Sequence, residues 1–291
     1  MRILVTGGCG FIGKHLVTKL RELRHDVVSI DIKGEPDYVI DICNIEELDL
    51  LHGKKFDTIY HLAAMSYGRG SEEQPQVDIQ TNVQGTFNIC TYAKNHNIKR
   101  IIYTSTMAVY GNRDNAKEDD VLNPLSNYAC SKLYGEFCIK RFREYNIDSV
   151  IFRLFNTYGP GSDLSNSNKG IVNAFISQLN SDRINVTGSL ERYRDLIYID
   201  DVIQALVLPL TQNNMKGTFN VCSGQKTTIK NLIEEILKIA NISEPAQIEN
   251  IGGHAGDPHG VYGNNTQLCR WGWTPQTPLL TGLDNCWEAL C

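Results

Sequence analysis

The stretch that decides the fold is ILVTGGCGFIG, residues 3–13. It opens with a short apolar run of the kind that forms a buried strand, and it continues into Phe11–Arg24, a segment of helical period. Glycines stand at positions 7, 10 and 13, in the turn and at the start of the helical segment. Glycines at this spacing allow a tight turn, let backbone N–H groups approach a pyrophosphate and let the helix pack closely on the strand. The stretch therefore predicts a strand–turn–helix unit that binds a dinucleotide.

A carboxylate after the second strand supports this interpretation over a plain tight turn. Asp31 ends that strand 18 residues past Gly13 (31 − 13), where an acid can accept hydrogen bonds from the adenosine ribose. Its charge would repel a 2′-phosphate, so the sequence favours NAD, although Lys33 leaves NADP open and a turn role for Asp31 is the alternative. Asp41 and Ile42 follow a third short apolar segment and are candidates to hold the adenine, which a turn aspartate explains almost as well.

Short apolar runs alternate with helical segments through the first half of the chain, which predicts a doubly wound α/β fold with a parallel sheet buried on both faces. The predicted strands are Ile3–Thr6, Asp26–Ile30, Phe56–Tyr60, Lys99–Thr104 and Ser149–Phe155. The predicted crossover helices are Phe11–Arg24, Gln76–His96 and Asn127–Tyr145.

The pattern changes past Tyr158, where a Gly-Pro-Gly turn opens a polar loop followed by short mixed elements and Pro-containing turns. We therefore expect a Rossmann-type cofactor domain over residues 1–158 and a smaller C-terminal, substrate-binding lobe over residues 159–291. Asp195–Leu210 contains a strand followed by a helix, and we expect it to return to the main domain.

The composition excludes several classes of protein. The chain has 291 residues, 42% of them hydrophobic, and a formal charge of −5, which excludes a disordered chain and, without a Lys/Arg cluster, disfavours a nucleic-acid binder. Nine cysteines are scattered, and no two form a C-x-x-C pair, so no metal site is expected. No apolar run approaches the roughly 18 residues of a membrane span. We expect a cytoplasmic protein with free thiols and no membrane association.

Tyr128 and Lys132 stand four residues apart, which places both on one face of a helix. Such a pair occurs by chance in many chains, so its position carries the information. It begins the helix that follows the strand ending at Thr106, and ligands in open α/β sheets bind beyond the carboxyl ends of strands. A hydroxyl, a phenol and an ammonium are thus expected to converge over the nicotinamide.

At this point the sequence resembles the extended short-chain dehydrogenase/reductase family, in its NAD-dependent nucleotide-sugar epimerase/dehydratase branch, over nearly the whole chain. The matching motifs are TGGxGFIG at 6–13, HLAA at 61–64, NVxGT at 82–86, a Thr-x-x-VYG at 106–111, YxxxK at 128–132, RxFNxYGP at 153–160 and RDxIYVDDV at 194–202.

The resemblance implies roles that fit the chemistry of the residues. Tyr128 would be the base that accepts a sugar hydroxyl proton, Lys132 would stabilise its phenolate and bind the nicotinamide ribose, and Thr106 would hold the sugar oxygen. For Thr106 a purely structural role at the strand end is the alternative. The implied cofactor-binding residues are Gly7, Gly10, Phe11, Ile12, Gly13, Asp31, Asp41, Ile42, Leu62, Ala63, Ala64, Asn82, Thr104, Tyr128 and Lys132.

The same resemblance implies that Asn156 and Arg194 bind the diphosphate of the substrate. Relatives carry a further Arg where this chain has His254, so we predict that Arg192 supplies the missing cation. Val261 occupies a position where relatives restricted to unacetylated hexoses carry a larger side chain, which suggests a pocket that accepts N-acetyl sugars.

The residues after Thr106 narrow the reaction. Dehydratases of this branch carry Asp-Glu there and decarboxylases tend to keep a Glu, whereas this chain has Met107 and Ala108, which transfer no proton. The resemblance thus implies a nucleotide-sugar 4-epimerase, with a UDP-sugar as first choice, in which the hydride leaves C4 and returns to the other face. An NDP-4-keto-sugar reductase or another NDP-sugar epimerase is the alternative, and a non-catalytic NAD-binding regulator is a remote one. By analogy the chain forms a homodimer.

Overall fold

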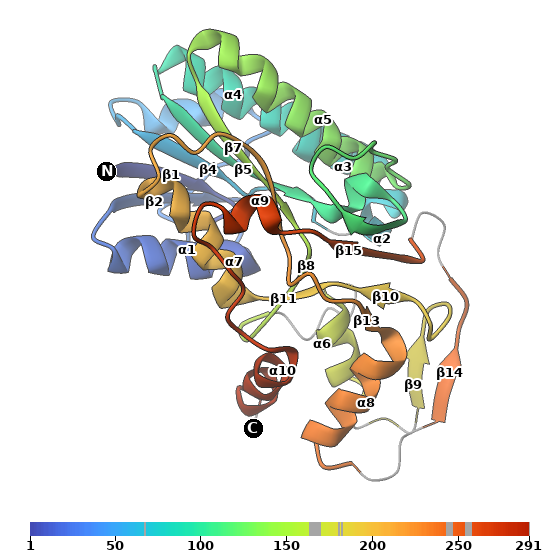
Figure 1. The fold of residues 1–291 in the computed structure, drawn as a ribbon. Helices are drawn as coiled ribbons and strands as arrows, with labels where there is room; N and C mark the ends of the chain where they lie inside the picture. Colours follow the sequence, from blue (N-terminus) through green and yellow to red (C-terminus); the bar gives the residue numbers. More distant parts are fainter. Residues whose placement is uncertain are drawn as a thin grey trace.

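A computed structural model shows the fold of the chain (Figure 1). It describes residues 1–66, 68–162, 170–179, 181, 183–242, 247–253 and 258–290.

A seven-stranded sheet forms the centre of the molecule, in the order β12-β7-β5-β4-β1-β2-β3, and every neighbouring pair in it is parallel. Its strands are β1 Arg2–Thr6, β2 Asp26–Asp31, β3 Tyr38–Val39, β4 Thr58–His61, β5 Arg100–Thr106, β7 Asp148–Leu154 and β12 Gly217–Val221. The order reverses between β1 and β4, which creates a crevice at the carboxyl ends of the strands. This arrangement confirms the predicted doubly wound α/β fold.

Helices cover both faces of this sheet (Figure 1). On one face, Ile3 and Val5 of β1 pack with Leu16 and Leu20 of α1 (Phe11–Glu22), which also contacts α7 (Ile199–Val207). On the other face, the intervening Leu4 belongs to the core beneath α4 (Thr86–Asn95) and α5 (Asn127–Arg141). Because successive side chains of a strand point to opposite faces, the unbroken apolar strands serve both layers.

The segment expected as one helix over Gln76–His96 is interrupted. It forms α3 (Pro75–Asp78), then the π-helix η2 (Ile79–Gly85), then α4. Within the π-helix, the Asn82 side chain bonds the backbone N–H and C=O of Met65, and the Thr86 hydroxyl donates to the Asn82 carbonyl at 2.7 Å. Wide turns of this kind are frequent near functional sites, and this one packs on α5, which contains Tyr128 and Lys132.

The strand within Asp195–Leu210 does not join the central sheet. It is β11 (Leu196–Tyr198), and it pairs with β8 (Asn156–Tyr158) in a two-stranded sheet, whereas the helix that follows, α7, packs on α1. The chain rejoins the central sheet later, at β12, which pairs with β7 from Gly217↔Val150 to Val221↔Leu154. The division of the chain near residue 158 stays a prediction.

The remaining elements form the lobe and the connections, and Figure 1 shows the lobe below the carboxyl ends of the central strands. A second sheet has the order β13-β10-β15-β6, and β14 pairs with β9. These elements are β6 Arg113–Ala116, β9 Arg183–Val186, β10 Tyr193–Arg194, β13 Thr227–Thr228, β14 Gln247–Asn250, β15 Gly260–Gly263, α2 Gly68–Glu73, α6 Ile171–Ile176, α8 Ile229–Ile239, α9 Thr266–Cys269 and α10 Leu279–Glu288, with short helices η1 Ile45–Leu51, η3 Met107–Tyr110, η4 Phe142–Tyr145 and η5 Leu208–Leu210.

Among the residues that the structure describes, we find no helix with both the length and the apolar character needed to cross a membrane.

Candidate active site

A cavity of about 1610 Å³ lies at the carboxyl ends of the central strands, between the sheet and the lobe. Its volume exceeds the range of roughly 300–1,000 Å³ that is usual for a drug-sized ligand, as a dinucleotide together with a second ligand requires. The predicted site residues that line it are Gly7, Gly10, Phe11, Ile12, Gly13, Asp31, Asp41, Ile42, Leu62, Ala63, Ala64, Thr104, Thr106, Tyr128, Lys132, Asn156 and Arg194. Asn82, Arg192 and Val261 are described but do not line it, and His254 lies outside the described residues.

The glycine turn at the cavity wall has no room for side chains. Gly7 has φ +71°, and a Cβ there would lie 2.7 Å from the backbone N of Ala63. At Gly13 a Cβ would lie 2.0 Å from the carbonyl oxygen of Gly7, so the start of α1 sits directly on the turn. This close packing leaves the N-terminus of the twelve-residue helix α1 open to the cavity, where its positive end suits a pyrophosphate.

Asp31 is held at the end of β2 by the backbone. Its Oδ2 accepts from the N–H of Cys9 at 3.0 Å and its Oδ1 accepts from the N–H of Ile32 at 2.8 Å. The same carboxylate lines the cavity beside the glycine turn, with its remaining acceptor capacity available to a ribose. Asp41 lies further along, where its Oδ1 accepts from the Cys43 N–H at 2.9 Å, and Ile42 packs against Gly85 of the π-helix.

Tyr128 and Lys132 sit in the first two turns of α5, whose first turn is capped by the Ser126 hydroxyl accepting from the Ala129 N–H. Lys132 is only 2% exposed, and its Nζ lies 4.3 Å from the centre of the Tyr103 ring. Burial lowers the pKa of Lys132 to about 7, against the opposing charges of Glu136 and Asp78. The Lys132 ammonium therefore loses its proton near neutral pH.

The Tyr128 phenol has the opposite shift. Burial raises the pKa of Tyr128 to about 12, although hydrogen bonding with the Thr106 side chain works against the rise. The unaided phenol is thus neutral at pH 7, and its ionisation requires further positive charge next to it. Thr106 ends β5, and its hydroxyl accepts from the Ala108 N–H at 3.2 Å, which fixes the side chain at the cavity wall.

Three of the residues predicted to bind the substrate, Asn156, Arg194 and Val261, belong to β8, β10 and β15. Arg194 is 6% exposed and lines the cavity, and its Nη1 donates to the carbonyl of Tyr193 at 2.7 Å. Asn156 donates from both its backbone N–H and its Nδ2 to the Asp195 carbonyl. Val261 pairs with Arg194 in the second sheet and is fully buried. The Arg192 guanidinium donates to the Thr187 carbonyl, away from the cavity lining, so its role at the diphosphate stays a prediction.

The match to a family model decides the family. Residues 3–222 match the model of the NAD dependent epimerase/dehydratase family. The chain belongs to this family. The matched range contains the glycine turn, the Tyr128–Lys132 pair and the strands of the central sheet from Ile3 of β1 to the end of β12.

Individual members of the epimerase/dehydratase family resemble this chain over most of its length. A dTDP-4-dehydro-6-deoxyglucose reductase of Escherichia coli is 32% identical over 80% of this chain and 80% of its own. A putative UDP-glucose 4-epimerase of Methanocaldococcus jannaschii is 31% identical over 97% of this chain and 95% of its own. The UDP-glucose 4-epimerase of Thermotoga maritima, solved with UDP-glucose, has a TM-score of 0.92 and 27% identity, covering 100% and 98% of the two chains.

NAD is the cofactor of this epimerase/dehydratase family member, as predicted from Asp31. The residues present fit it, because the wall at Gly7 and Gly13 has no room for side chains and Asp31 lines the cavity beside that wall. The relatives of the chain include both a reductase and epimerases, so membership of the family does not by itself define the reaction.

A polar network behind the cofactor site was not predicted from the sequence. The Thr86 hydroxyl donates to the Asn82 carbonyl, so it accepts from Nε2–H of the buried His61, whose Nδ1 then accepts from the Thr6 hydroxyl. Burial lowers the pKa of His61 to about 3, which keeps it neutral. The Asn82 Nδ2 also donates to Asp78 at 2.7 Å. The TGGxGFIG, HLAA and NVxGT motifs contain Thr6, His61, Asn82 and Thr86, and none of these motifs shows that the four residues meet.

Proposed function

We propose that this member of the epimerase/dehydratase family is an NAD-dependent UDP-sugar 4-epimerase. The observation that carries the proposal is the pair Met107 and Ala108, which line the cavity directly after Thr106. Eliminating water requires an acid and a base beyond the tyrosine, and these two side chains supply neither. Interconversion at C4 requires only a base, a hydrogen-bonding partner for the 4-hydroxyl and a retained NAD.

In the proposed mechanism the chain moves one proton and holds the sugar in place. NAD, when bound, supplies the reversible hydride acceptor and a positive ring. Tyr128, as phenolate, accepts the proton of the 4-hydroxyl and later returns it, while Thr106 keeps the sugar oxygen within hydrogen-bonding reach. Lys132 stabilises the phenolate with its ammonium and binds the nicotinamide ribose, which offsets the raised pKa of Tyr128.

The proposed substrate class rests on Arg194, a cation of the lobe that lines the cavity. Arg194 lines the cavity and carries a planar guanidinium, which suits bidentate binding of a diphosphate, and Asn156 lies beside it on β8. The nucleotide is proposed to be uridine, because the Thermotoga maritima enzyme of the same fold was solved with UDP-glucose.

A test of the cofactor separates this proposal from its main alternative. The purified protein is denatured, and the supernatant is assayed for NAD. One NAD per chain, with no requirement for added cofactor, supports the epimerase. The alternative, a 4-keto-sugar reductase, is favoured by the 32% identity to the Escherichia coli enzyme, and it predicts an empty protein that oxidises NADPH with a dTDP-4-keto-6-deoxy sugar.

We further propose that the protein is a homodimer formed through α4 and α5. The outward stripe of α5 carries Tyr134 and Phe137, which are 45% and 60% exposed, and Phe87 of α4 beside it is 43% exposed. Exposed aromatic side chains that cluster on two packed helices are typical of a protein interface. A second copy of the same face would bury them in a four-helix arrangement. The cytoplasmic location stays the prediction of the cysteine pattern.

A further inference from the structure

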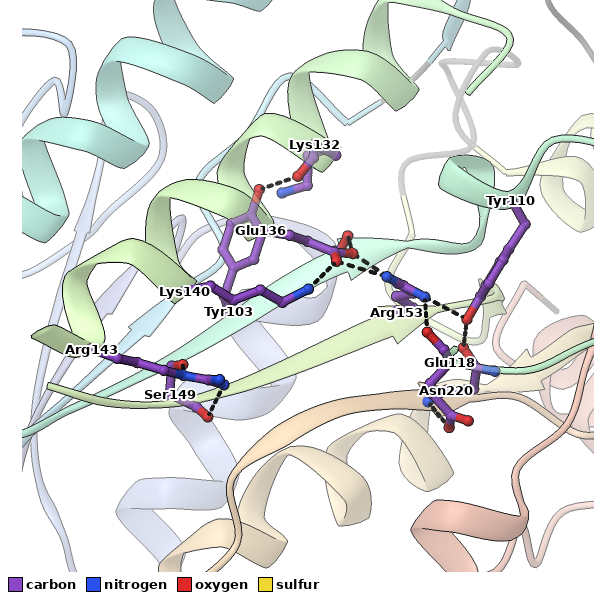
Figure 2. Close-up of polar contacts among 11 residues, drawn as sticks. Tyr103, Tyr110, Glu118, Lys132, Glu136, Lys140, Arg143, Ser149, Arg153 and Asn220 are labelled. Atoms are coloured by element: carbon purple, nitrogen blue, oxygen red, sulfur yellow. Dashed lines mark hydrogen bonds and ion pairs between the residues drawn. The ribbon is translucent and has the colours of Figure 1, made fainter. Parts of the chain in front are cut away.

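A buried carboxylate lies one helical turn beyond the proposed catalytic pair. Tyr128, Lys132 and Glu136 are spaced four residues apart on α5, so they follow one another on one face of the helix. Glu136 is fully buried. Figure 2 shows its carboxylate between α5 and the strands of the central sheet, with the Lys132 side chain above it.

The Glu136 carboxylate accepts hydrogen bonds from Ser105, Arg153 and Lys140. Its Oε1 accepts from Ser105 Oγ at 2.7 Å and from Arg153 Nε at 2.8 Å, and its Oε2 accepts from Arg153 Nη2 at 2.8 Å and Lys140 Nζ at 3.2 Å. Burial by itself would raise the pKa of Glu136, but the hydrogen bonds and charge of Arg153 hold this pKa below its usual value. The carboxylate is therefore ionised and bound in the two-pronged geometry that fixes an arginine and a carboxylate rigidly.

The partners of Glu136 lie next to the third catalytic candidate. Ser105 immediately precedes Thr106 on β5, and in the sheet it pairs with Arg153 of β7. One carboxylate thus ties the helix that supplies Tyr128 and Lys132 to the strand end that supplies Thr106. These hydrogen bonds restrict movement of α5 along β5. Such movement would change the distance between the Tyr128 phenol and the Thr106 hydroxyl.

Arg153 extends the same network from β7 to η3 and β12. It is 2% exposed, and its Nη1 donates to the Tyr110 hydroxyl at 2.8 Å and the Glu118 carbonyl at 3.0 Å. The Tyr110 hydroxyl in turn donates to Asn220 Oδ1 of β12 at 2.7 Å (Figure 2). The network therefore continues from the catalytic helix through the sheet to the segment η3, which follows Thr106.

We propose, resting on the proposed epimerase function, that Glu136 held by Arg153 is a positioning residue, which fixes Tyr128 and Lys132 against Thr106 and keeps a negative charge one turn from the Lys132 ammonium. A buried ion pair is weak evidence for stability, since replacing both partners by apolar groups is often neutral. The position of this pair between the two catalytic elements gives it a role in the site.

The charge has a measurable consequence for Lys132. The charged and titratable groups that face Lys132 are Asp78 of α3, His61 of β4, Tyr103 of β5, and Tyr128 and Glu136 of α5. Glu136 is the first of the groups that raise the pKa of Lys132 against its burial. Removing that charge while Arg153 stays positive must lower the midpoint at which the ammonium loses its proton.

The test uses the NAD-loaded protein with carbon-13 at the lysine Cε, in which the Lys132 resonance is assigned with Lys132→Arg and followed against pH. In Glu136→Gln we expect the Lys132 midpoint to fall by about one pH unit or more, and the alkaline limb of kcat to move with it. The matched control is Arg143→Gln, which removes the 2.8 Å hydrogen bond from Arg143 of η4 to Ser149 of β7. We expect this variant to keep the wild-type Lys132 midpoint. A folded Glu136→Gln variant with the wild-type midpoint overturns the proposal.

Ser105→Ala keeps the proposal testable if Glu136→Gln does not fold, because it removes one hydrogen bond and leaves the ion pair intact. We expect kcat to fall about five- to tenfold with KM, NAD content and melting temperature near wild type. A wild-type kcat in this variant contradicts the positioning role. If the unaltered protein epimerises no sugar, the proposed function fails, while the Lys132 midpoint in Glu136→Gln still decides the present proposal.

Discussion

The Nζ of Lys132 lies 4.3 Å from the centre of the Tyr103 ring, beneath α5 and almost completely shielded from water. The ring face gives the ammonium a partial counter-charge, but it does not replace hydration. The buried lysine therefore costs stability whenever it is charged.

The first prediction concerns this cost. Burial lowers the pKa of Lys132 from 10.5 to about 7, so between these pH values the unfolded chain binds more protons than the folded one, and stability rises with pH. Between pH 7 and 9.5 we expect the free energy of unfolding of the cofactor-free protein to rise by about 2–3 kcal/mol more than that of Lys132→Met, measured by urea denaturation. The exposed Lys55→Met serves as control and should follow the wild type. Equal slopes for wild type and Lys132→Met would refute the burial argument.

The second prediction concerns the phenol. Tyr128→Phe removes the proposed proton acceptor and leaves the ring in place, so we expect kcat to fall about a thousandfold with NAD content unchanged. Tyr145→Phe removes a phenol from a half-exposed tyrosine just beyond α5 and should keep wild-type turnover. Retained turnover in Tyr128→Phe would rule out its role as the base.

The third prediction concerns cofactor choice. Asp31→Asn removes the charge of the carboxylate that we propose accepts from the ribose, and we expect NAD affinity to fall about ten- to a hundredfold while discrimination against NADP weakens. Asp26→Asn changes an aspartate at the opposite, exposed end of the same strand and should alter neither. Fluorescence titration of the cofactor-free protein measures both affinities, and an unchanged preference in Asp31→Asn would show that another group selects NAD.

The fourth prediction concerns the glycine turn. A methyl group at Gly13 would lie 2.0 Å from the Gly7 carbonyl, which neither backbone segment can avoid without moving apart. We expect Gly13→Ala to yield protein without bound NAD or to prevent folding. Gly253→Ala places the same methyl group in open space and should leave NAD content at the wild-type value. Full NAD occupancy in Gly13→Ala would show that the turn is looser than its packing indicates.

The fifth prediction concerns assembly. Phe137→Asp places a charge in the centre of the exposed aromatic face of α5, and we expect sedimentation to show a monomer where the unaltered protein is a dimer. Val121→Asp changes a side chain that is 80% exposed and lies outside α4 and α5, and should leave the dimer intact. A dimeric Phe137→Asp variant would place the interface elsewhere.

The sequence predicts those strands and helices that are determined by a few neighbouring residues. The strands around residues 3, 26, 58, 100 and 149 and the helix from Phe11 are found within two residues of their expected bounds, because apolar runs and the glycine turn act within a few positions. The π-helix over Ile79–Gly85 has no such signal, since it depends on side-chain bonds of Asn82 to Met65, 17 residues away.

Contacts between distant segments account for the rest. The sequence places β12 in a region of mixed elements, and only its pairing with β7 makes it the seventh central strand. Glu136 carries no marker in the sequence either: its importance rests on meeting Ser105 and Arg153, which are 31 and 17 residues away. Short sequence motifs locate the proposed catalytic and cofactor-binding residues. The residues that hold these side chains in position, such as Glu136, are brought to them only by the tertiary fold.

The central claim, interconversion of a UDP-sugar at C4 with retained NAD, is tested most directly with a substrate carrying deuterium at C4. UDP-glucose and UDP-N-acetylglucosamine labelled in this way are incubated with the purified protein without added cofactor, and the anomeric proton signals and the deuterium content are followed by NMR and mass spectrometry. The account predicts a new UDP-sugar epimeric at C4 that keeps its deuterium. No new sugar nucleotide, or an epimer that has lost the deuterium to solvent, would contradict it.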